Sequence, residues 1–169
     1  MEALEQLSGP DPLEDWHDTG AFASAEPLLD QWLRRRALAN QTTGASRTFA
    51  ISLDRVVVAY YALAAGAVEN DQAPGRFRRK MPDPIPVVVL GRLAVDLAWQ
   101  RRGLGRAMIW DAARRIAQAA DVIGIRGILV HVMSDSARAY YLSLGFEPAL
   151  SDPRTLMITL ADVRKALDR

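Results

Sequence analysis

The sequence predicts an α/β (α+β) fold in which helices flank one central, mixed and twisted sheet. Stretches with the two-residue period of strands alternate with stretches that have the 3.6-residue period of helices. A turn that contains glycine joins a long apolar strand directly to an amphipathic helix. The 169 residues, half of them hydrophobic, are enough to bury one core. We therefore expect a single domain over residues 1–169.

The first part of the chain is predicted to contain a short strand and then a helix. Weak periodicity indicates a strand at 3–7 and a turn at 11–15. From residue 25 to about residue 40, apolar positions recur at helical spacing. Ser24 is the expected N-cap of this helix, and Pro27 suits its first turn. We thus expect an amphipathic helix with a basic outer face.

A hairpin is predicted after this helix. Runs at 48–53 and 56–66 are typical of strands, and Asp54 and Arg55 between them form a tight turn. The following segment, 68–86, has four prolines and no clear period, which indicates a long surface connection. Connections of this length are usually functional or mobile.

The second half of the chain is predicted to alternate between strands and helices. The expected elements are, in order, a strand at 87–95, a helix at 103–120, a strand at 127–133, a helix that ends at 144 and a strand at 155–160. The first of these strands is rich in β-branched residues, which indicates a central strand buried on both faces. Ser134 or Asp135 is the expected N-cap of the short helix, and Gly145 is expected to end it.

The composition argues against several classes of chemistry. The chain has no cysteine and only two histidines, far apart, so neither a disulfide nor a catalytic metal site is expected. No apolar run is long enough for a membrane span, and the N-terminus lacks the features of a signal peptide. We therefore expect a cytoplasmic protein without a metal. Its net charge of +1 argues against a uniformly basic nucleic-acid binder.

The turn between the strand at 87–95 and the helix at 103–120 has the features of an anion-binding loop. Gly103 and Gly105 allow backbone N–H groups to approach a phosphate closely, and the positive end of the helix dipole favours the anion. The residues predicted to hold a diphosphate are Gln100, Arg101, Arg102, Gly103, Leu104, Gly105 and Arg106. The alternative interpretation is a strand-to-helix turn whose glycines serve packing alone.

This loop resembles motif A of the GNAT acetyltransferases, in which Gln/Arg-x-x-Gly-x-Gly/Ala follows a strand, here one that ends in Arg92–Asp96. The stretch 137–146, which ends in Gly-Phe, resembles the second signature of that family. The resemblance covers residues 48–160 and implies the GNAT fold, with acetyl-CoA in a splay between two central parallel strands. It also implies that three further residues contact the cofactor, namely Leu93, Ala94 and Val95.

The N-terminal half resembles a narrower group, the TacT- and AtaT-like toxins of bacterial toxin–antitoxin modules. The matching stretches include 28–33, 44–49, 60–63 and 86–96. This resemblance implies that acetyl passes from acetyl-CoA to the α-amino group of aminoacyl-tRNA, which blocks translation. It also implies a ribbon-helix-helix antitoxin, contact with operator DNA only through that antitoxin, and a homodimer. Two alternatives stay open: acetylation of a small amine or a protein N-terminus, and a catalytically idle GNAT-fold module.

The resemblance assigns the general acid to Tyr141. Amide formation releases a CoA thiolate that must be protonated, and a tyrosine hydroxyl near the sulfur can supply the proton. Tyr140 is one residue away, points to a different side of the helix and is expected to pack. Asp96, the carboxylate nearest to the central strand, is interpreted as a helix-entry charge. His131 is expected to be a buried core histidine.

Basic clusters supply candidate contacts for tRNA phosphates. The candidates are Arg34, Arg36, Arg47, Arg76, Arg78, Arg79, Lys80 and Arg92. A tRNA acceptor arm requires several phosphate contacts. A run of charges is nevertheless more often a solvated helix face. The sequence leaves open whether these side chains share one face.

Overall fold

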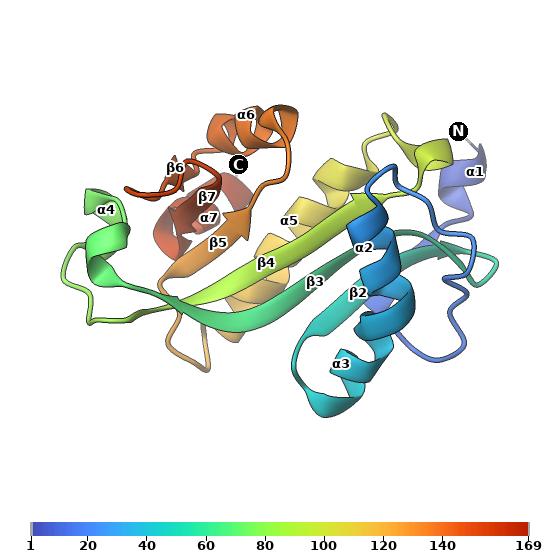
Figure 1. Cartoon of the computed structure of the whole chain (residues 1–169), viewed down its shortest axis with the longest axis horizontal. Coiled ribbons are helices and arrows are strands. Elements are labelled where there is room, and N and C mark those ends of the chain that lie inside the picture. Colours follow the sequence, from blue (N-terminus) through green and yellow to red (C-terminus); the bar gives the residue numbers. More distant parts are fainter. Residues whose placement is uncertain (1, 169) are drawn as a thin grey trace. The chain divides into compact units, whose positions relative to one another are not determined.

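The computed structural model describes residues 2–168 (Figure 1), with side chains described from Leu4 onward. Strands and helices alternate along the chain, as the sequence predicts. The chain divides into two compact units, one made of Met1–Ala64 and Arg92–Ala112, the other of Ala65–Gly91 and Ala113–Arg169. No helix in the described part of the chain is long and apolar enough to cross a membrane.

The described strands form one mixed sheet in the order β1-β2-β3-β4-β5-β7-β6. Their bounds are β1 Ser8–Pro12, β2 Arg47–Leu53, β3 Val56–Val68, β4 Ile85–Val95, β5 Gly127–His131, β6 Glu147–Pro148 and β7 Thr155–Thr159. β4 and β5 run parallel, in register from Val87 opposite Gly127 to Leu90 opposite Val130. β4 then continues to Val95, past the last described pair with β5. The predicted mixed sheet with a central parallel pair is confirmed.

In the first unit, a helical layer packs against the β2–β3 hairpin (Figure 1). The layer consists of α2 Pro27–Trp32, the π-helical turn η1 Leu33–Ala37 and α3 Leu38–Thr43. Leu33 and Ala37 are buried in one cluster with Ala50, Val57 and Tyr60 of the two strands. The amphipathic helix that the sequence predicts is therefore confirmed, and it ends a few residues later than expected.

The hairpin has the turn that its two connecting residues predict. Asp54 and Arg55 have φ angles of 49° and 77°. Two successive positive φ angles define the I′ turn that matches the twist of paired strands. The rest of the unit contains the short helix α1 Glu2–Glu5, the 3-10 turn η3 Leu97–Trp99 and the first part of α5 Leu104–Ala119.

The predictions for the first residues are wrong. A strand was expected at 3–7, but that stretch contains α1, and the strand β1 begins only at Ser8. β1 contains Pro10 and Pro12, which hide the strand pattern in the sequence. Proline is tolerated at a sheet edge, where the missing N–H is not needed, and β1 lies at the edge of the sheet. Because β1 runs to Pro12, the turn predicted at 11–15 begins only at residue 15.

The second unit has a core of its own around Phe77. This residue belongs to α4 Gly75–Arg78, which follows the 3-10 turn η2 Asn70–Gln72. Phe77 is buried with Ile85, Val87, Leu129 and Met157 of three strands. The segment 68–86, expected as a long connection, therefore carries two short helical turns and supplies a core residue.

The C-terminal part confirms one predicted helix and adds two elements. In α6 Asp135–Ser143, the Ser134 hydroxyl accepts a hydrogen bond from the Ala137 N–H at 3.1 Å, and Gly145 (φ 105°) follows the helix end, both as predicted. β6, which is only two residues long, and α7 Leu160–Leu167, a short amphipathic helix of eight residues, were not predicted. The prediction that His131 is buried is wrong, since it ends β5 with an exposed side chain.

Candidate active site

The loop predicted to bind a diphosphate lies in the first unit, between η3 and α5. Its backbone turns at Arg101 (φ 63°) and at Gly103 (φ 87°). A Cβ atom on Gly103 would have no atom within 4 Å, so this glycine serves the conformation of the backbone rather than packing. The interpretation that the glycines serve packing alone therefore fails at Gly103. At Gly105, a Cβ atom would lie in ordinary contact with Val95, 4.0 Å from its Cγ2.

The N-terminus of α5 provides a set of backbone donors for an anion. The Gly103 carbonyl accepts a hydrogen bond from the Ala107 N–H at 3.1 Å, which places the start of the helix at the glycine. The first N–H groups of a helix have no partners within it, and the helix dipole makes this end positive. Arg101, Arg102 and Arg106 are exposed beside it, and the Arg102 guanidinium lies 4.9 Å above the Trp99 ring. The loop can thus hold a diphosphate by backbone donors and arginines.

A cavity of about 250 Å³ lies at the end of β4 in the same unit. It is lined by Ser24, Glu26, Leu29, Leu93, Ala94, Val95 and Gln100. The three β4 residues that the family resemblance assigns to the cofactor therefore share one cavity with Gln100 of the loop. Ser24 and Glu26 from the segment before α2, with Leu29 of α2 itself, complete its wall.

The side chain of Gln100 connects these parts. Its Nε2 donates hydrogen bonds to the Ser24 carbonyl at 3.0 Å and to the Val95 carbonyl at 2.9 Å. Gln100 was predicted to contact the cofactor; the described hydrogen bonds of its side chain go to protein carbonyls. Gln100 thus links the loop, the end of β4 and the segment before α2.

The segment before α2 is held by a buried carboxylate. Asp30 is 7% exposed, and both of its oxygens accept from the Ser24 N–H, at 3.0 and 3.1 Å. The Ser24 hydroxyl donates to Asp30 at 2.6 Å and accepts from the Glu26 N–H at 3.2 Å. Between them Ala25 has φ 79°, which is unfavourable for a residue with a side chain. The predicted N-cap is therefore wrong: Glu26 occupies that position, and Ser24 instead binds Asp30.

Asp96 has the structural role expected for it. Its carboxylate accepts from the Ala98 N–H at 3.0 Å and so caps η3, and it also accepts from the Ala23 N–H at 3.1 Å. Both carboxylate oxygens are engaged with backbone donors. Asp96 is thus a poor candidate for a general base.

Tyr141 lies in α6, in the second unit, and is 8% exposed. Its ring packs edge-on against Phe146, with centroids 5.1 Å apart. Burial raises the pKa of the Tyr141 phenol, and the neighbouring Tyr140 raises it further. A raised pKa keeps the phenol protonated, as a proton donor requires. The hydroxyl of Tyr140 is buried without a hydrogen-bond partner among the described residues.

The basic candidates of the first unit are partly engaged in local contacts. The Arg34 guanidinium donates to the Phe22 carbonyl at 2.7 Å, and that of Arg47 donates to the Gln41 carbonyl at 2.7 Å. The Arg92 guanidinium lies 4.7 Å above the Trp32 ring. Arg36 is exposed. All four lie in one unit, but only the exposed parts of these side chains are available to a phosphate.

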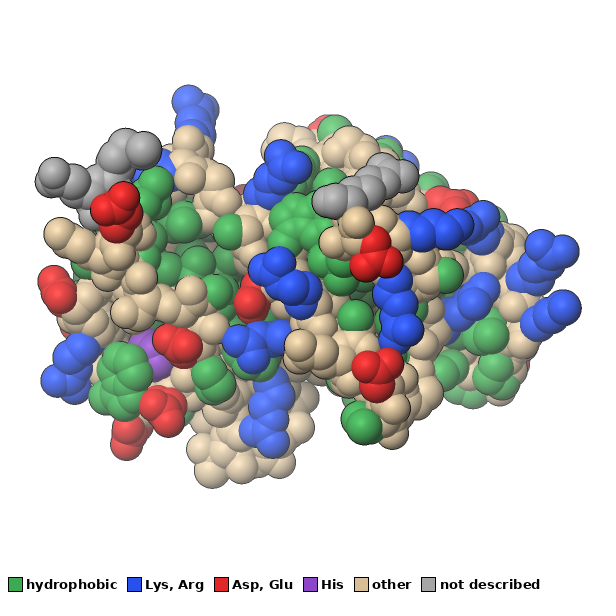
Figure 2. Space-filling model, turned by 180° about the vertical axis from the view of Figure 1, so that it is seen from behind, with side chains coloured by type: hydrophobic (Ala, Val, Ile, Leu, Met, Phe, Trp, Pro, Cys, Tyr) green, Lys and Arg blue, Asp and Glu red, His purple; other side chains and the backbone are tan. Residues whose placement is uncertain are grey.

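Among the basic candidates of the second unit, one side chain is engaged in a local ion pair and three are exposed. Arg76 forms a two-point ion pair with Asp162, at 2.9 and 2.7 Å. Arg78, Arg79 and Lys80 are exposed. Figure 2 shows many Lys and Arg side chains on the face seen from behind, with Asp and Glu side chains among them. The side chains of the exposed cluster 78–80 are thus more accessible to a phosphate than that of Arg76.

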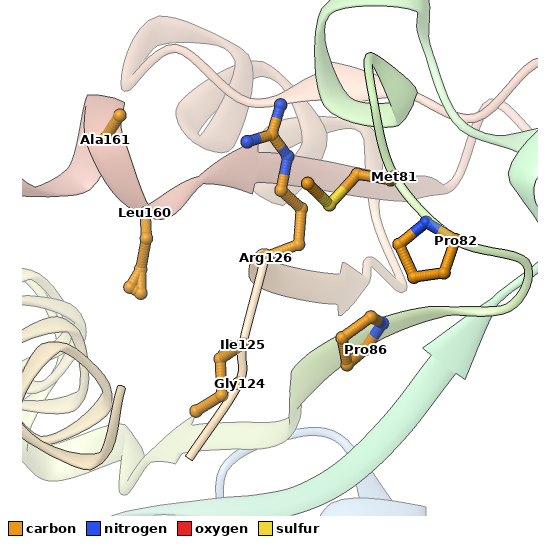
Figure 3. Close-up of a pocket in the computed structure, with 8 residues that line it drawn as sticks. All are labelled: Met81, Pro82, Pro86, Gly124, Ile125, Arg126, Leu160 and Ala161. Atoms are coloured by element: carbon orange, nitrogen blue, oxygen red, sulfur yellow. The ribbon is translucent and has the colours of Figure 1, made fainter. Parts of the chain in front are cut away.

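A second cavity, of about 330 Å³, lies in the second unit (Figure 3). It is lined by Met81, Pro82, Pro86, Gly124, Ile125, Arg126, Leu160 and Ala161. Arg126 is its one titratable residue, and the guanidinium donates to the carbonyls of Phe77 and Arg76, each at 2.8 Å. This cavity therefore offers apolar walls and little chemistry. Among the described residues, no group of three or more His, Asp and Glu side chains could hold a metal ion.

Sequence reasoning missed the residues that shape the wall of the first cavity. Ser24, Asp30 and Glu26 were not predicted to lie at the site. One signal was available, because Asp30 stands among apolar residues of an amphipathic helix, where a charge must find a partner. The side-chain role of Gln100 had no signal in the sequence, since its partners are backbone carbonyls, and one of them, that of Ser24, is 76 residues away.

The mixed sheet with its central parallel pair, followed by a glycine-containing loop that opens a helix, is the arrangement of a GNAT-type acyltransferase. A family model for the GNAT acetyltransferase domain matches residues 46–148. The chain belongs to the GNAT acetyltransferase family, as the sequence predicts.

The chain is also similar to more specific relatives. The chain is 51% identical over 161 residues to a tRNA-acetylating toxin of Mycobacterium tuberculosis. The matched region covers 95% of this chain and 97% of that toxin. It is similar to AtaT complexed with acetyl-methionyl-tRNAfMet, with a TM-score of 0.85, 26% identity and coverage of 92% of this chain and 96% of that one. It is also similar to AtaTR bound with AcCoA, with a TM-score of 0.83, 25% identity and coverage of 96% and 98%. The expected likeness to TacT- and AtaT-like toxins is confirmed.

Proposed function

We propose that this protein is a toxin that transfers acetyl from acetyl-CoA to the α-amino group of aminoacyl-tRNA and thereby blocks translation. The observation that carries the proposal is the loop 100–106, which has positive φ angles at Arg101 and Gly103. The loop leads from the end of β4, where the cavity lies, to the start of α5. The relative that is 51% identical over nearly the whole chain is a tRNA-acetylating toxin. The proposal treats residues 1–169 as one catalytic domain.

Each part of the reaction has candidate groups in the chain. The N–H groups of the loop 100–106 hold the diphosphate of acetyl-CoA, and the backbone of Leu93, Ala94 and Val95 contacts the part of the molecule that carries the acetyl group. The amine nitrogen attacks the thioester carbon to form the C–N bond, the C–S bond breaks, and the nitrogen releases one proton to solvent, from which the Tyr141 phenolate later regains its proton. Tyr141 then donates its hydroxyl proton to the leaving thiolate. Its raised pKa means that it holds the proton until that moment.

The tRNA contacts are assigned to the exposed cations. In this proposal Arg36 and the cluster 78–80 bind phosphates, while Arg34, Arg47, Arg76 and Arg92 keep the local contacts described above and contribute charge. Such contacts carry a strong dependence on salt. Because acetyl-CoA and charged tRNA are both cytoplasmic, the reaction places the enzyme in the cytoplasm. By resemblance to the toxins, we further propose a homodimer that a ribbon-helix-helix antitoxin inhibits, and that contacts operator DNA only through the antitoxin.

The test uses the purified full chain with labelled acetyl-CoA and total charged tRNA. We expect label on the amino acid of charged tRNA and none on uncharged tRNA. Tyr141→Phe should bind acetyl-CoA normally but transfer acetyl about 10²- to 10⁴-fold more slowly, since general acid catalysis contributes that much. Tyr140→Phe is the matched variant and should retain most of the rate.

Two results would contradict the proposal. Label on free amines or peptide N-termini with none on charged tRNA would move the enzyme to the alternative substrate class. Equal rates for wild type and Tyr141→Phe would show that water or another group protonates the thiolate.

A further inference from the structure

The cavity at the end of β4 carries one titratable side chain in its wall. It lies within the first unit and measures about 250 Å³. Four of its lining residues are apolar, and the side-chain amide of a fifth, Gln100, donates to two backbone carbonyls. The other two residues of the described wall are Ser24 and Glu26, and Glu26 carries the titratable group. A pocket for a drug-sized ligand has about 300–1,000 Å³, so this cavity fits the thioester end of acetyl-CoA with an attacking amine rather than the whole cofactor.

The backbone of Glu26 is fixed, whereas its carboxylate has no partner in the described part of the chain. The Glu26 N–H donates to the Ser24 Oγ at 3.2 Å, and Ser24 is in turn bound by the buried carboxylate of Asp30. Pro27 follows and restricts Glu26 to the extended backbone that it adopts. Glu26 occupies the N-cap position of α2, but its side chain accepts no capping hydrogen bond. The side chain is exposed, so a substrate that enters the cavity can reach it.

Acetyl transfer to an amine needs a proton acceptor at this cavity. The amine attacks in its neutral form, and its nitrogen gives up one proton as the amide forms. Two carboxylates adjoin lining residues in the sequence, but Asp30 and Asp96 both accept from backbone N–H groups. The two adjoining arginines, Arg92 and Arg101, carry guanidinium groups, which only donate. Glu26 is therefore the charged group at this cavity that can take the proton.

We propose that Glu26 binds the substrate amine in this cavity and is the general base of the acetyl transfer. The inference rests on the proposed function, which places the part of acetyl-CoA that carries the acetyl group beside Leu93, Ala94 and Val95. These three residues and Glu26 line the same cavity of the same unit. The Glu26 carboxylate accepts a hydrogen bond from the amine N–H and so holds the nitrogen next to the thioester.

The proton then follows the change in bonding at the nitrogen. As the nitrogen forms the C–N bond with the acetyl carbon it becomes acidic, and one N–H proton passes to a carboxylate oxygen of Glu26. The C–S bond breaks, and the thiolate takes the hydroxyl proton of Tyr141. Glu26 releases its proton to solvent, from which the Tyr141 phenolate regains one. The net products are the acetylated amine and CoA-SH.

The first experiment separates binding of the cofactor from binding of the amine. Glu26→Gln keeps the size of the side chain but cannot act as a base. We expect its thermal unfolding and its affinity for acetyl-CoA, measured by calorimetry, to match those of the wild type, because the loop 100–106 is unchanged. Glu69→Gln is the matched control, since Glu69 is an exposed glutamate of the second unit, at the N-cap position of η2 and also without a capping bond. A loss of acetyl-CoA affinity in Glu26→Gln alone would assign Glu26 to the cofactor and overturn the proposal.

The second experiment measures single-turnover acetyl transfer to charged tRNA across a range of pH, with enzyme and acetyl-CoA in saturating excess. Glu26→Gln should be about 10²-fold slower or more at neutral pH, as expected for the loss of a general base. The difference from the wild type should shrink as the pH rises, because hydroxide then takes the proton. Glu26→Ala, which leaves space for a small carboxylate, should regain part of the rate with added formate. Glu69→Gln should match the wild type at every pH.

The outcomes separate this inference from the proposed function. If the wild type acetylates an amine other than that of charged tRNA, the proposed substrate is wrong, and the same variants on that amine still decide the role of Glu26. If wild type and Glu26→Gln transfer acetyl equally fast at neutral pH, Glu26 is not the base. Slow Glu26 variants that neither higher pH nor formate restores would assign Glu26 a structural role and overturn the proposal.

Discussion

The hydrogen bonds between Asp30 and Ser24 give a sharp prediction for stability. Asp30 is 7% exposed and accepts the Ser24 N–H with both oxygens and the Ser24 hydroxyl at 2.6 Å. Asp30→Asn keeps the size of the side chain but replaces one acceptor oxygen by a donor, which then faces the donor groups of Ser24. Because Ser24 is itself 6% exposed, water cannot easily replace the lost partner.

The size of the effect follows from these contacts. Hydrogen bonds to charged groups contribute about 1.5–3 kcal/mol, and a buried donor left without a partner costs about 1–3 kcal/mol. We therefore expect Asp30→Asn to lower the free energy of unfolding by about 2 kcal/mol. For a chain of this length, that corresponds to a fall in Tm of roughly 4–8 °C. Release of Ser24 also removes the bonds that hold Ala25 at its positive φ angle, so acetyl-CoA should bind more weakly.

The assay is urea unfolding at neutral pH, followed by far-UV circular dichroism. Asp121→Asn is the matched control, because the Asp121 side chain is 71% exposed and its described ion pair is with the exposed Arg164; it should change stability by less than about 0.5 kcal/mol. Ala25→Gly adds a second check, since glycine adopts φ 79° without a steric penalty. If Asp30→Asn unfolds at the same urea concentration as the control, the hydrogen bonds between Asp30 and Ser24 have no stabilising role and the reasoning is refuted.

Two further predictions concern the second unit. Gly127→Ala should lower the free energy of unfolding by more than about 2 kcal/mol, because its Cβ would lie only 1.9 Å from the backbone oxygen of Ile158; Gly75→Ala, which would meet no atom within 4 Å, should be neutral in the same urea assay. The hydrogen bond from Arg76 lowers the pKa of Asp162, so the ion pair contributes stability above the ordinary pKa of an aspartate, about 4, and loses it as the pH falls through the lower folded value. Arg76→Ala should therefore be less stable than wild type at neutral pH and equal to it in strong acid; a difference in Tm that stays constant with pH would contradict this assignment.

Local patterns predicted the elements that depend on neighbours in sequence. The hairpin turn at Asp54 and Arg55, the cap at Ser134 and the helix end at Gly145 all follow from the conformational preferences of single residues. The loop 100–106 belongs to the same class, because its glycine is required by the backbone angle at position 103. These features need no knowledge of distant partners.

Features that depend on distant partners were missed or misplaced. β1 forms although it contains two prolines, because β2 provides its partner and no strand lies on its other side. Ser24 has the composition of an N-cap, but the carboxylate of Asp30 binds it and the helix starts later. His131 follows four apolar residues of a buried strand and looks like part of it, yet the strand ends there and leaves the ring exposed. The pairing with β2 at β1, and the hydrogen bonds to Asp30 at Ser24, thus override the local preference.

Gln100 shows how one motif position can serve two purposes. The motif predicts that this residue contacts the cofactor, and its backbone stands at the start of the loop, where an N–H can face a phosphate. Its side chain, however, donates to the carbonyls of Ser24 and Val95. An arginine at the same motif position could also donate to both carbonyls, whereas a carboxylate could not, because it only accepts. The choice of Gln or Arg in the motif therefore agrees with a side chain that must donate to two fixed carbonyls while the backbone remains available for the anion.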